Sequence, residues 1–251
     1  MKIGLWNIDH PETASGVLRK ERRFQEVTDY LMQAACDAYI ITEANAAIDL
    51  SGYFCELSDE SPFKSSSRFY GGANSYHQVA IYCQTPLERS DVDEPINGLL
   101  CKVADHGCLE QLYGNVVTIK DQWSKTSSKT YSDRLSEQID AVRSLISEGT
   151  LVGGDFNLRL GWPQKRLAHS RVKEELAAKG WAWPTETRED TVQHVLHSPG
   201  IAVDLTIDFD VKYGANKATG LSDHPFIEIS LTDATAGGMH WVASEAVEPV
   251  S

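Results

Sequence analysis

The stretch Leu151-Val152-Gly153-Gly154-Asp155-Phe156-Asn157 lies in mid-chain and is the most informative part of the sequence. Its apolar residues and glycines predict a buried strand with a sharp exit. Side chains alternate on an extended backbone, so Asp155 and Asn157 should point to the same side. A carboxylate and a carboxamide placed together can hold a water molecule and an oxyanion. Taken alone, the string is equally compatible with a Gly-Asp turn in which Asn157 caps the next element.

The string Ser222-Asp223-His224-Pro225 precedes a strand-like run near the end of the sequence. An imidazole that binds an oxyanion needs a partner to fix its tautomer and charge. Asp204 lies within the apolar run 202–207, where a carboxylate is costly unless it has such a partner. We therefore predict that Asp204 orients His224. The alternative is a loop Asp-His pair with Asp204 at a strand end.

Acidic and amide side chains also follow the first two predicted strands. Asn7 and Asp9 end the first strand, and Glu43 ends the second. Hard oxygen ligands from these three residues and Asp223 suit Mg²⁺ or Mn²⁺, with waters at the remaining positions. The five cysteines are scattered without a Cys-x-x-Cys pair, which disfavours zinc and a disulfide framework. These residues together predict metal-assisted attack of water on a phosphate ester.

The spacing of apolar residues predicts an α/β protein. Helical spacing is found over 18–35, 132–147 and 171–179, and strand-like runs over 3–8, 38–42, 79–83, 99–103, 112–119, 151–152, 191–196, 202–209 and 226–231. Two strand-rich halves with intervening helices predict a four-layer α/β sandwich, in which two packed mixed β-sheets are flanked by helices. Residues 1–232 form the single predicted domain, and 233–251 are predicted to be a loose tail.

Composition sets limits on location and partners. The chain has 251 residues, of which 41% are hydrophobic, and a formal net charge of −13. This charge argues against non-specific coating of duplex nucleic acid. The sequence has no apolar leader and no run of about 18 apolar residues, so we expect a cytoplasmic protein with no membrane span and with reduced thiols.

The order of five short motifs resembles the endonuclease/exonuclease/phosphatase superfamily, including its abasic-site endonucleases and deoxyribonucleases. The motifs are Trp6-Asn7-Ile8-Asp9, Thr42-Glu43, Gly154-Asp155-Phe156-Asn157, Val203-Asp204 and Ser222-Asp223-His224-Pro225. The resemblance spans residues 1 to about 231, and the joint order of the motifs is more specific than any one of them. The resemblance implies the four-layer sandwich and a metal-dependent hydrolase of phosphate esters.

The resemblance also implies roles for the matching positions. The positions at or beside the metal are Glu43, Asn7 and Asp223. The positions that act on water and phosphate are Asp155 for water activation, Asn157 for phosphate binding, His224 for transition-state stabilisation, and Asp204 as the partner of that histidine.

One motif of the superfamily is missing. Many members carry a second histidine in a Thr-His-Leu-like string, whereas residues 115–120 of this chain contain no histidine. The abasic-site endonucleases have a tyrosine near that position, so activity does not require the histidine. Lys120, Tyr113 and Tyr131 are the candidates to serve the leaving oxygen.

Basic and aromatic residues follow the central motif and predict a substrate. Arg159, Lys165 and Arg166 lie in a segment without acids, together with Trp162, and Lys120 begins a second basic loop. Cations for phosphates and aromatic rings for bases favour single-stranded or locally opened DNA or RNA. The acidic net charge keeps open a phosphatase or phosphodiesterase of a small phosphorylated metabolite or lipid headgroup. A phosphate-binding module without activity is the third reading.

Overall fold

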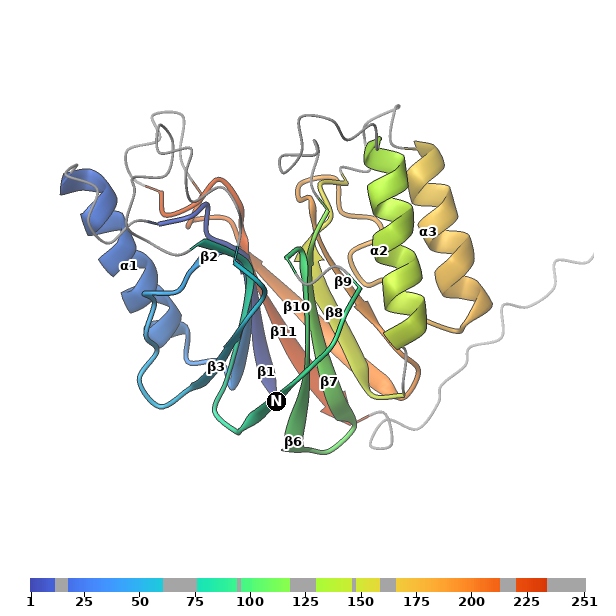
Figure 1. Cartoon of the computed structure of the whole chain (residues 1–251), viewed down its shortest axis with the longest axis horizontal. Helices are drawn as coiled ribbons and strands as arrows, with labels where there is room; N and C mark the ends of the chain where they lie inside the picture. Colours follow the sequence, from blue (N-terminus) through green and yellow to red (C-terminus); the bar gives the residue numbers. More distant parts are fainter. Residues whose placement is uncertain are drawn as a thin grey trace, which may run out of the picture.

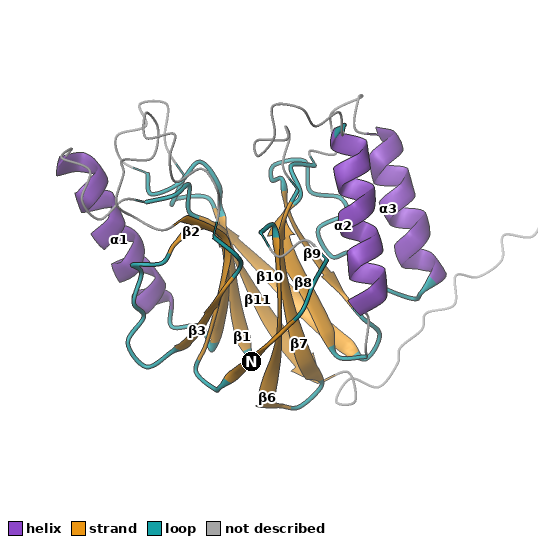
Figure 2. Ribbon diagram, viewed as in Figure 1, coloured by secondary structure: helices purple, strands orange, loops and turns teal. Residues whose placement is uncertain are grey.

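The computed structural model of the chain describes residues 1–11, 18–60, 76–93, 96–117, 130–145, 148–158, 166–212 and 220–233. Two β-sheets pack face to face, with helices on the outer face of each (Figure 1). Helix α1 covers one sheet, and helices α2 and α3 cover the other (Figure 2). The predicted four-layer α/β sandwich is confirmed.

The first sheet has six strands and is mixed. Its order is β10 (Ile201–Asp208), β11 (Phe226–Asp233), β1 (Lys2–Asn7), β2 (Ala38–Asn45), β4 (Tyr76–Cys83) and β3 (Phe54–Leu57). Strand β1 pairs in parallel with β2 and antiparallel with β11. The first and the last of the described strands are therefore neighbours in the middle of this sheet.

The second sheet has five strands. Its order is β5 (Leu87–Ser90), β6 (Gly98–His106), β7 (Leu109–Val116), β8 (Thr150–Asp155) and β9 (Gln193–His197). Strands β7 and β8 are parallel, and the other neighbours are antiparallel. The parallel pairs of both sheets end at the same end of the sandwich (Figure 1).

The helices are α1 (Leu18–Ala34), α2 (Tyr131–Leu145) and α3 (Arg166–Ala178). Val27 and Leu31 of α1 pack on the outer face of the first sheet, and Leu135 and Val172 of α2 and α3 pack on the second. Helix α2 begins after Thr130, whose hydroxyl accepts from the Asp133 N–H at 3.2 Å. None of the described helices is long and apolar enough to cross a membrane.

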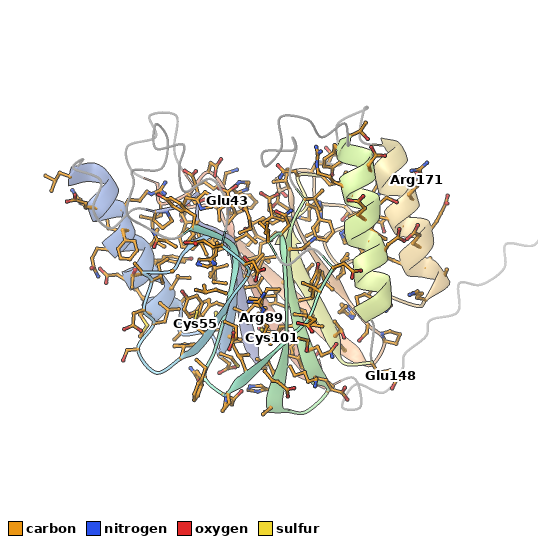
Figure 3. The ribbon with its side chains drawn as sticks, in the orientation of Figure 1. Glu43, Cys55, Arg89, Cys101, Glu148 and Arg171 are labelled. Atoms are coloured by element: carbon orange, nitrogen blue, oxygen red, sulfur yellow. The ribbon has the colours of Figure 1, made fainter. Side chains whose placement is uncertain are left out.

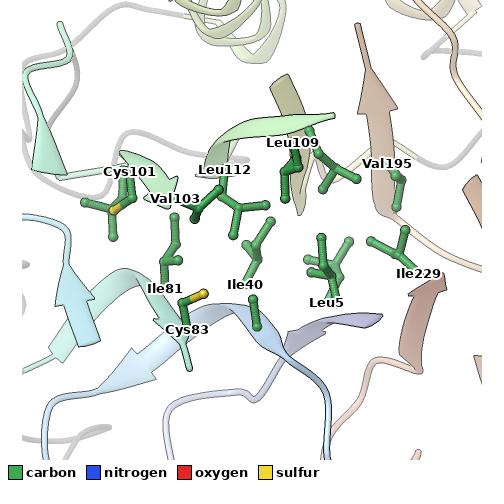
Figure 4. Close-up of a cluster of buried hydrophobic side chains, with 14 of the residues drawn as sticks. Leu5, Ile40, Ile81, Cys83, Cys101, Val103, Leu109, Leu112, Val195 and Ile229 are labelled. Carbon is green, nitrogen blue, oxygen red and sulfur yellow. The ribbon is translucent and has the colours of Figure 1, made fainter. Parts of the chain in front are cut away.

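The space between the sheets is filled by apolar side chains that alternate along the strands (Figure 4). Ile3 and Leu5 of β1 point inward, so the next inward position of this strand is Asn7. A Cβ atom on Gly153 would lie 3.0 Å from Ile40 Cδ1 of the facing sheet. The glycine therefore allows β8 to approach the first sheet just before Asp155.

Several element boundaries differ from the predictions. Helix α3 begins at Arg166 and not at residue 171, and strands β3 and β5 were not predicted. Both are four-residue edge strands without buried side chains, so they carry little apolar alternation. The predicted tail lies outside the described residues from 234 onward, so it stays a prediction.

Candidate active site

Five strand ends bring the predicted residues together at one end of the sandwich. The carboxyl ends of β1, β2 and β8 lie beside the amino ends of β9 and β11, as the registers Asn7↔Thr42 and Asp155↔Gln193 require. Figure 3 labels Glu43 at this end of the molecule. The alternation of β1 and β8 turns Asn7 and Asp155 toward each other across the two sheets, and Asn7 Nδ2 donates to Asp155 Oδ2 at 2.9 Å.

Asn7 is the centre of a buried hydrogen-bond network. Its backbone N–H donates to Gln193 Oε1 at 2.6 Å, and its carbonyl oxygen accepts from Ser222 Oγ at 2.5 Å. Its side-chain Oδ1 accepts from the Asp9 N–H at 2.9 Å. Because Asn7 is fully buried, each of these bonds replaces water that the site excludes.

Asp155 has the surroundings of a general base. Its side chain is 2% exposed, and Oδ1 accepts from the Asn157 N–H at 2.8 Å. Burial raises the pKa of Asp155 above its ordinary value, while His224 and the N–H groups of Asn157 and Asn7 act in the opposite direction. A carboxylate with a raised pKa is a better proton acceptor for a bound water.

His224 is held over Asp155 by its own loop. His224 Nε2 lies 3.8 Å from Asp155 Oδ2 and 3.2 Å from Asp223 Oδ1. Its carbonyl oxygen accepts from Trp6 Nε1 at 3.1 Å, and its N–H donates to Ser222 Oγ at 3.1 Å. The imidazole therefore sits between a buried carboxylate and the 59% exposed carboxylate of Asp223.

The predicted pairing of Asp204 with His224 is wrong. Asp204 is opposite Ser230 in the β10–β11 ladder, six residues beyond His224, which is about 20 Å along an extended strand. Its side chain is exposed, so it does not bear the burial cost that motivated the prediction. The carboxylates beside His224 are Asp155 and Asp223.

Glu43 lies close to three other carboxylates. Burial, followed by the charges of Asp155, Asp9 and Asp223, raises the pKa of Glu43 to about 8, although its side chain remains 28% exposed. His10 Nε2 lies 3.9 Å from Glu43 Oε2. Such a concentration of negative charge is costly unless protons or a cation compensate it.

Asp9 has a different neighbour. Its Oδ2 accepts from Arg23 Nη1 at 2.9 Å, and its carbonyl oxygen accepts from Arg23 Nη2 at 2.5 Å. The structure thus places Asp9 beside the site, with its carboxylate in an ion pair to helix α1. It is the least suitable of the four predicted metal ligands.

Left-handed backbone conformations concentrate around this site. Glu43, Asp9, His10 and Asn157 have φ between 42° and 52°, and Ala35 is the one other non-glycine residue with positive φ among the described parts of the chain. L-residues adopt this region at a cost of about 1–3 kcal/mol each. At Glu43 it shifts the alternation of β2, since Ile40 faces the inner core and Ala44 the outer one. The Glu43 carboxylate is thereby placed near Asn7 and Asp155, at the ends of β1 and β8.

The donor set fits a hard divalent cation. The oxygens of Glu43, Asp223 and Asn7 are the ligand types that Mg²⁺ and Mn²⁺ prefer. Burial is the main cause of the raised pKa of Glu43, and the negative charges of Asp155, Asp9 and Asp223 add to it. Among the described residues, no three His, Cys, Asp or Glu side chains converge closely enough to enclose a metal ion by themselves.

Asn157 stands beside Asp155, and its Nδ2 donates to the Val117 carbonyl oxygen at 2.9 Å. Val117 follows β7 and is buried under helices α2 and α3. Of the candidates for the leaving oxygen, Tyr113 is buried in the same core and cannot reach a substrate. Tyr131 is nearer, because its hydroxyl donates to the Phe156 carbonyl oxygen at 2.8 Å and the charge of Asp155 adds to the burial that raises its pKa.

The predicted substrate-binding residues are not placed by the structure. Arg159, Trp162, Lys165 and Lys120 lie outside the described residues, and Arg166 begins helix α3 without a described side chain. Their contact with a substrate stays a prediction.

The sequence reasoning missed two residues of strand β9. Gln193 bonds to Asn7 on one side of the strand. On the other side, His194 Nε2 donates to the Leu158 carbonyl oxygen at 2.7 Å, and Nδ1 accepts from Trp183 Nε1 at 3.2 Å. The available signal was the adjacent polar pair Gln193-His194 directly before the apolar residues Val195 and Leu196.

The pH dependence of stability should reveal the role of His194. Burial lowers the pKa of His194 from 6.5 to about 4. Between these values the unfolded chain binds a proton that the folded chain excludes, so the free energy of unfolding falls as pH falls from about 6.5 to 4, by at most about 1.4 kcal/mol per pH unit. Urea unfolding of the wild type and His194→Gln should show a difference that shrinks over this range. A difference independent of pH would contradict this.

The fold and the site define a class of protein. Two packed mixed sheets carry the buried side chains of Asn7 and Asp155, the half-buried His224 and a group of carboxylates at their common end, as in layered α/β hydrolases of phosphate esters. A sequence model described as the Endonuclease/Exonuclease/phosphatase family matches residues 4–224. The chain belongs to this family, and the predicted enzyme class, a hydrolase acting on phosphate esters, is confirmed. No curated protein matches the sequence significantly.

Solved structures with the same fold include nucleases and phosphatases. The 3′ phosphatase NExo from Neisseria, bound to a product DNA hairpin, is 13% identical and has a TM-score of 0.62, with 92% of this chain and 99% of that chain covered. The mannosyl-6-phosphatase Bt3783 from Bacteroides thetaiotaomicron has the same four values. The human Nocturnin catalytic domain is 14% identical, with a TM-score of 0.59 and coverage of 92% and 93%. At these identities the likeness shows the fold.

Proposed function

We propose that the chain is a divalent-metal-dependent nuclease that hydrolyses phosphodiester bonds of single-stranded or locally opened nucleic acid by attack of water. The observation that carries the proposal is the arrangement of Asn7, Asp155 and His224 beside Glu43. It places a buried proton acceptor, an amide and an imidazole around one position where a phosphate group could bind.

Each residue has a separate task in the proposed reaction. Asp155 accepts the proton of the attacking water, and Asn7 fixes the orientation of the Asp155 carboxylate through the 2.9 Å bond. His224 donates to a phosphate oxygen and stabilises the charge that develops in the transition state. Asn157, with its second amide hydrogen, donates to a phosphate oxygen on the other side of Asp155.

Three residues would provide the ligands of the metal ion. Glu43 and Asp223 would bind Mg²⁺ or Mn²⁺, with the amide oxygen of Asn7 beside them. The ion would supply neutralisation of charge on a phosphate or leaving oxygen. Deprotonation of Glu43 is required for binding, so metal affinity should increase as pH rises toward about 8.

Two observations bear on the substrate. The Neisseria relative was solved with a product DNA hairpin, and another structure of the same fold is named a 3′-5′ exonuclease from Neisseria meningitidis, which supports a nucleic-acid substrate. The second candidate is a phosphatase of a small metabolite. It is supported by the mannosyl-6-phosphatase fold and by the net charge of −13.

The proposal is tested with a panel of substrates. Single- and double-stranded DNA, abasic duplex, RNA and bis-p-nitrophenyl phosphate are each incubated with Mg²⁺, Mn²⁺ or EDTA, alongside Asp155→Ala. We expect metal-dependent cleavage of the polynucleotides that the variant lacks. Cleavage of the small ester alone supports the phosphatase. If the folded, metal-bound protein hydrolyses none of the substrates, the result supports a phosphate-binding module without activity.

A further inference from the structure

We propose that Gln193 is a positioning residue that sets the spacing between His224 and Asp155. The inference rests on the proposed hydrolytic function of the same site. Gln193 is fully buried at the amino end of β9, opposite Asp155 of β8. Its side chain leaves the five-stranded sheet and reaches the six-stranded one.

Gln193 makes one hydrogen bond to each of two separate segments of the first sheet. Its Oε1 accepts from the Asn7 N–H at 2.6 Å, at the end of β1. Its Nε2 donates to the Pro225 carbonyl oxygen at 2.7 Å, at the start of β11. Gln193 lies opposite Asp155 in the β8–β9 ladder. The side-chain amide of Gln193 therefore links the part of the second sheet that carries Asp155 to the end of β1 and to the start of β11.

The loop that carries His224 is held by hydrogen bonds from several segments. The N–H groups of Leu221 and Ser222 donate to the Val211 carbonyl oxygen at 2.8 and 3.3 Å. The His224 carbonyl oxygen is held by Trp6 Nε1, and the next carbonyl, of Pro225, is held by Gln193. Ser222 Oγ donates to the Asn7 carbonyl oxygen. Of these contacts, the one from Gln193 is the one that comes from the sheet bearing Asp155. It is therefore the contact that fixes the 3.8 Å separation of His224 Nε2 and Asp155 Oδ2.

The two bonds require the chemistry of a glutamine at this position. One end of the group must accept and the other must donate, which an amide does and a carboxylate does not. Asparagine is shorter by one methylene, about 1.5 Å, and cannot span both partners. Methionine has the length of glutamine without either hydrogen bond, so it tests the bonds while largely conserving volume.

The first test compares Gln193→Met with wild type as full-length, metal-loaded protein on bis-p-nitrophenyl phosphate and single-stranded DNA. We expect kcat to fall about 10²-fold with KM nearly unchanged, because a misplacement of about 1 Å can cost that much. Gln111→Met is the matched control. Gln111 accepts from Thr150 Oγ1 at 3.1 Å, at the opposite end of β7 and β8, and its replacement should leave kcat unchanged.

The second test uses Gln193→Glu, which separates positioning from a loss of stability. A neutral carboxylic acid can accept from Asn7 and donate to Pro225, whereas an ionised one cannot donate. The ratio of kcat between variant and wild type should therefore be near one at low pH and fall about tenfold per pH unit above the pKa of the new carboxyl group. Titrations common to both proteins cancel in this ratio.

Crystal structures of the wild type and Gln193→Met complete the test. We expect the separation of His224 Nε2 and Asp155 Oδ2 to change in the variant. The role of Gln193 would be overturned by a wild-type kcat in Gln193→Met, or by an unchanged separation of His224 Nε2 and Asp155 Oδ2 in its crystal structure. It would also be overturned if the ratio of kcat between Gln193→Glu and wild type did not change with pH. A wild type without turnover would instead reject the proposed function, and the separation in the two crystal structures would then decide the role of Gln193 by itself.

Discussion

Replacing Asp155 by Asn should lower kcat by about 10³-fold or more, with the fold intact. The change keeps the size of the side chain and removes the proton acceptor, so about 4 kcal/mol of transition-state stabilisation is lost. The one amide oxygen can accept from either Asn7 Nδ2 or the Asn157 N–H, and the buried charge disappears. The measurement is single-turnover hydrolysis of bis-p-nitrophenyl phosphate in Mg²⁺, with the melting temperature recorded in parallel.

The matched control for this prediction is Asp204→Asn. It is the same chemical substitution on exposed strand β10, far from His224. Wild-type kcat is expected for this variant. A large loss in Asp204→Asn, or near-normal turnover in Asp155→Asn, would contradict the assignment of the base.

Replacing Glu43 by Gln should lower activity at fixed metal concentration by about 10²-fold or more, and the metal concentration needed for half-maximal rate should increase. A neutral amide is a weaker ligand for a hard cation than a carboxylate. Titration of the rate with Mg²⁺ at pH 8 measures both effects. Glu88→Gln, on edge strand β5, is the control that should titrate as wild type.

The same variant should have the opposite effect on stability without metal. The pKa of Glu43 in the folded chain, about 8, lies above its ordinary value of 4.5. Folding is therefore disfavoured as pH rises from about 4.5 to 8, because the unfolded chain loses this proton first. In EDTA at pH 8, Glu43→Gln should melt at a higher temperature than wild type. A lower melting temperature would show that the carboxylate is not destabilising in the metal-free protein.

Strand-end residues were predictable because they depend on local chemistry. Asn7, Glu43 and Asp155 each follow an apolar run, and the period of two fixes which of their neighbours face the core. Parallel pairing then brings such ends together. The layers of the fold followed from the same alternation and from the helical spacing between the strands.

The pairing of Asp204 with His224 was beyond this kind of reasoning. The error arose because a carboxylate in an apolar run was assumed to be buried, whereas the β10–β11 register leaves Asp204 in solvent. Gln193 was missed because its importance comes from long-range contacts. Its role depends on contacts to residues 186 and 32 positions away in the chain, which no local pattern encodes. The left-handed conformation at Glu43 is also set by tertiary packing.

The pairing of β11 with β1 in the middle of the six-stranded sheet has a consequence for biosynthesis. A ribosome that has translated the chain only as far as residue 219 has synthesised neither His224 nor β11, the strand that pairs with β1. Until residues 220–233 emerge, one edge of β1 lacks its hydrogen-bonding neighbour, and the nascent chain is held without a complete site. The site can therefore be completed only after translation of β11.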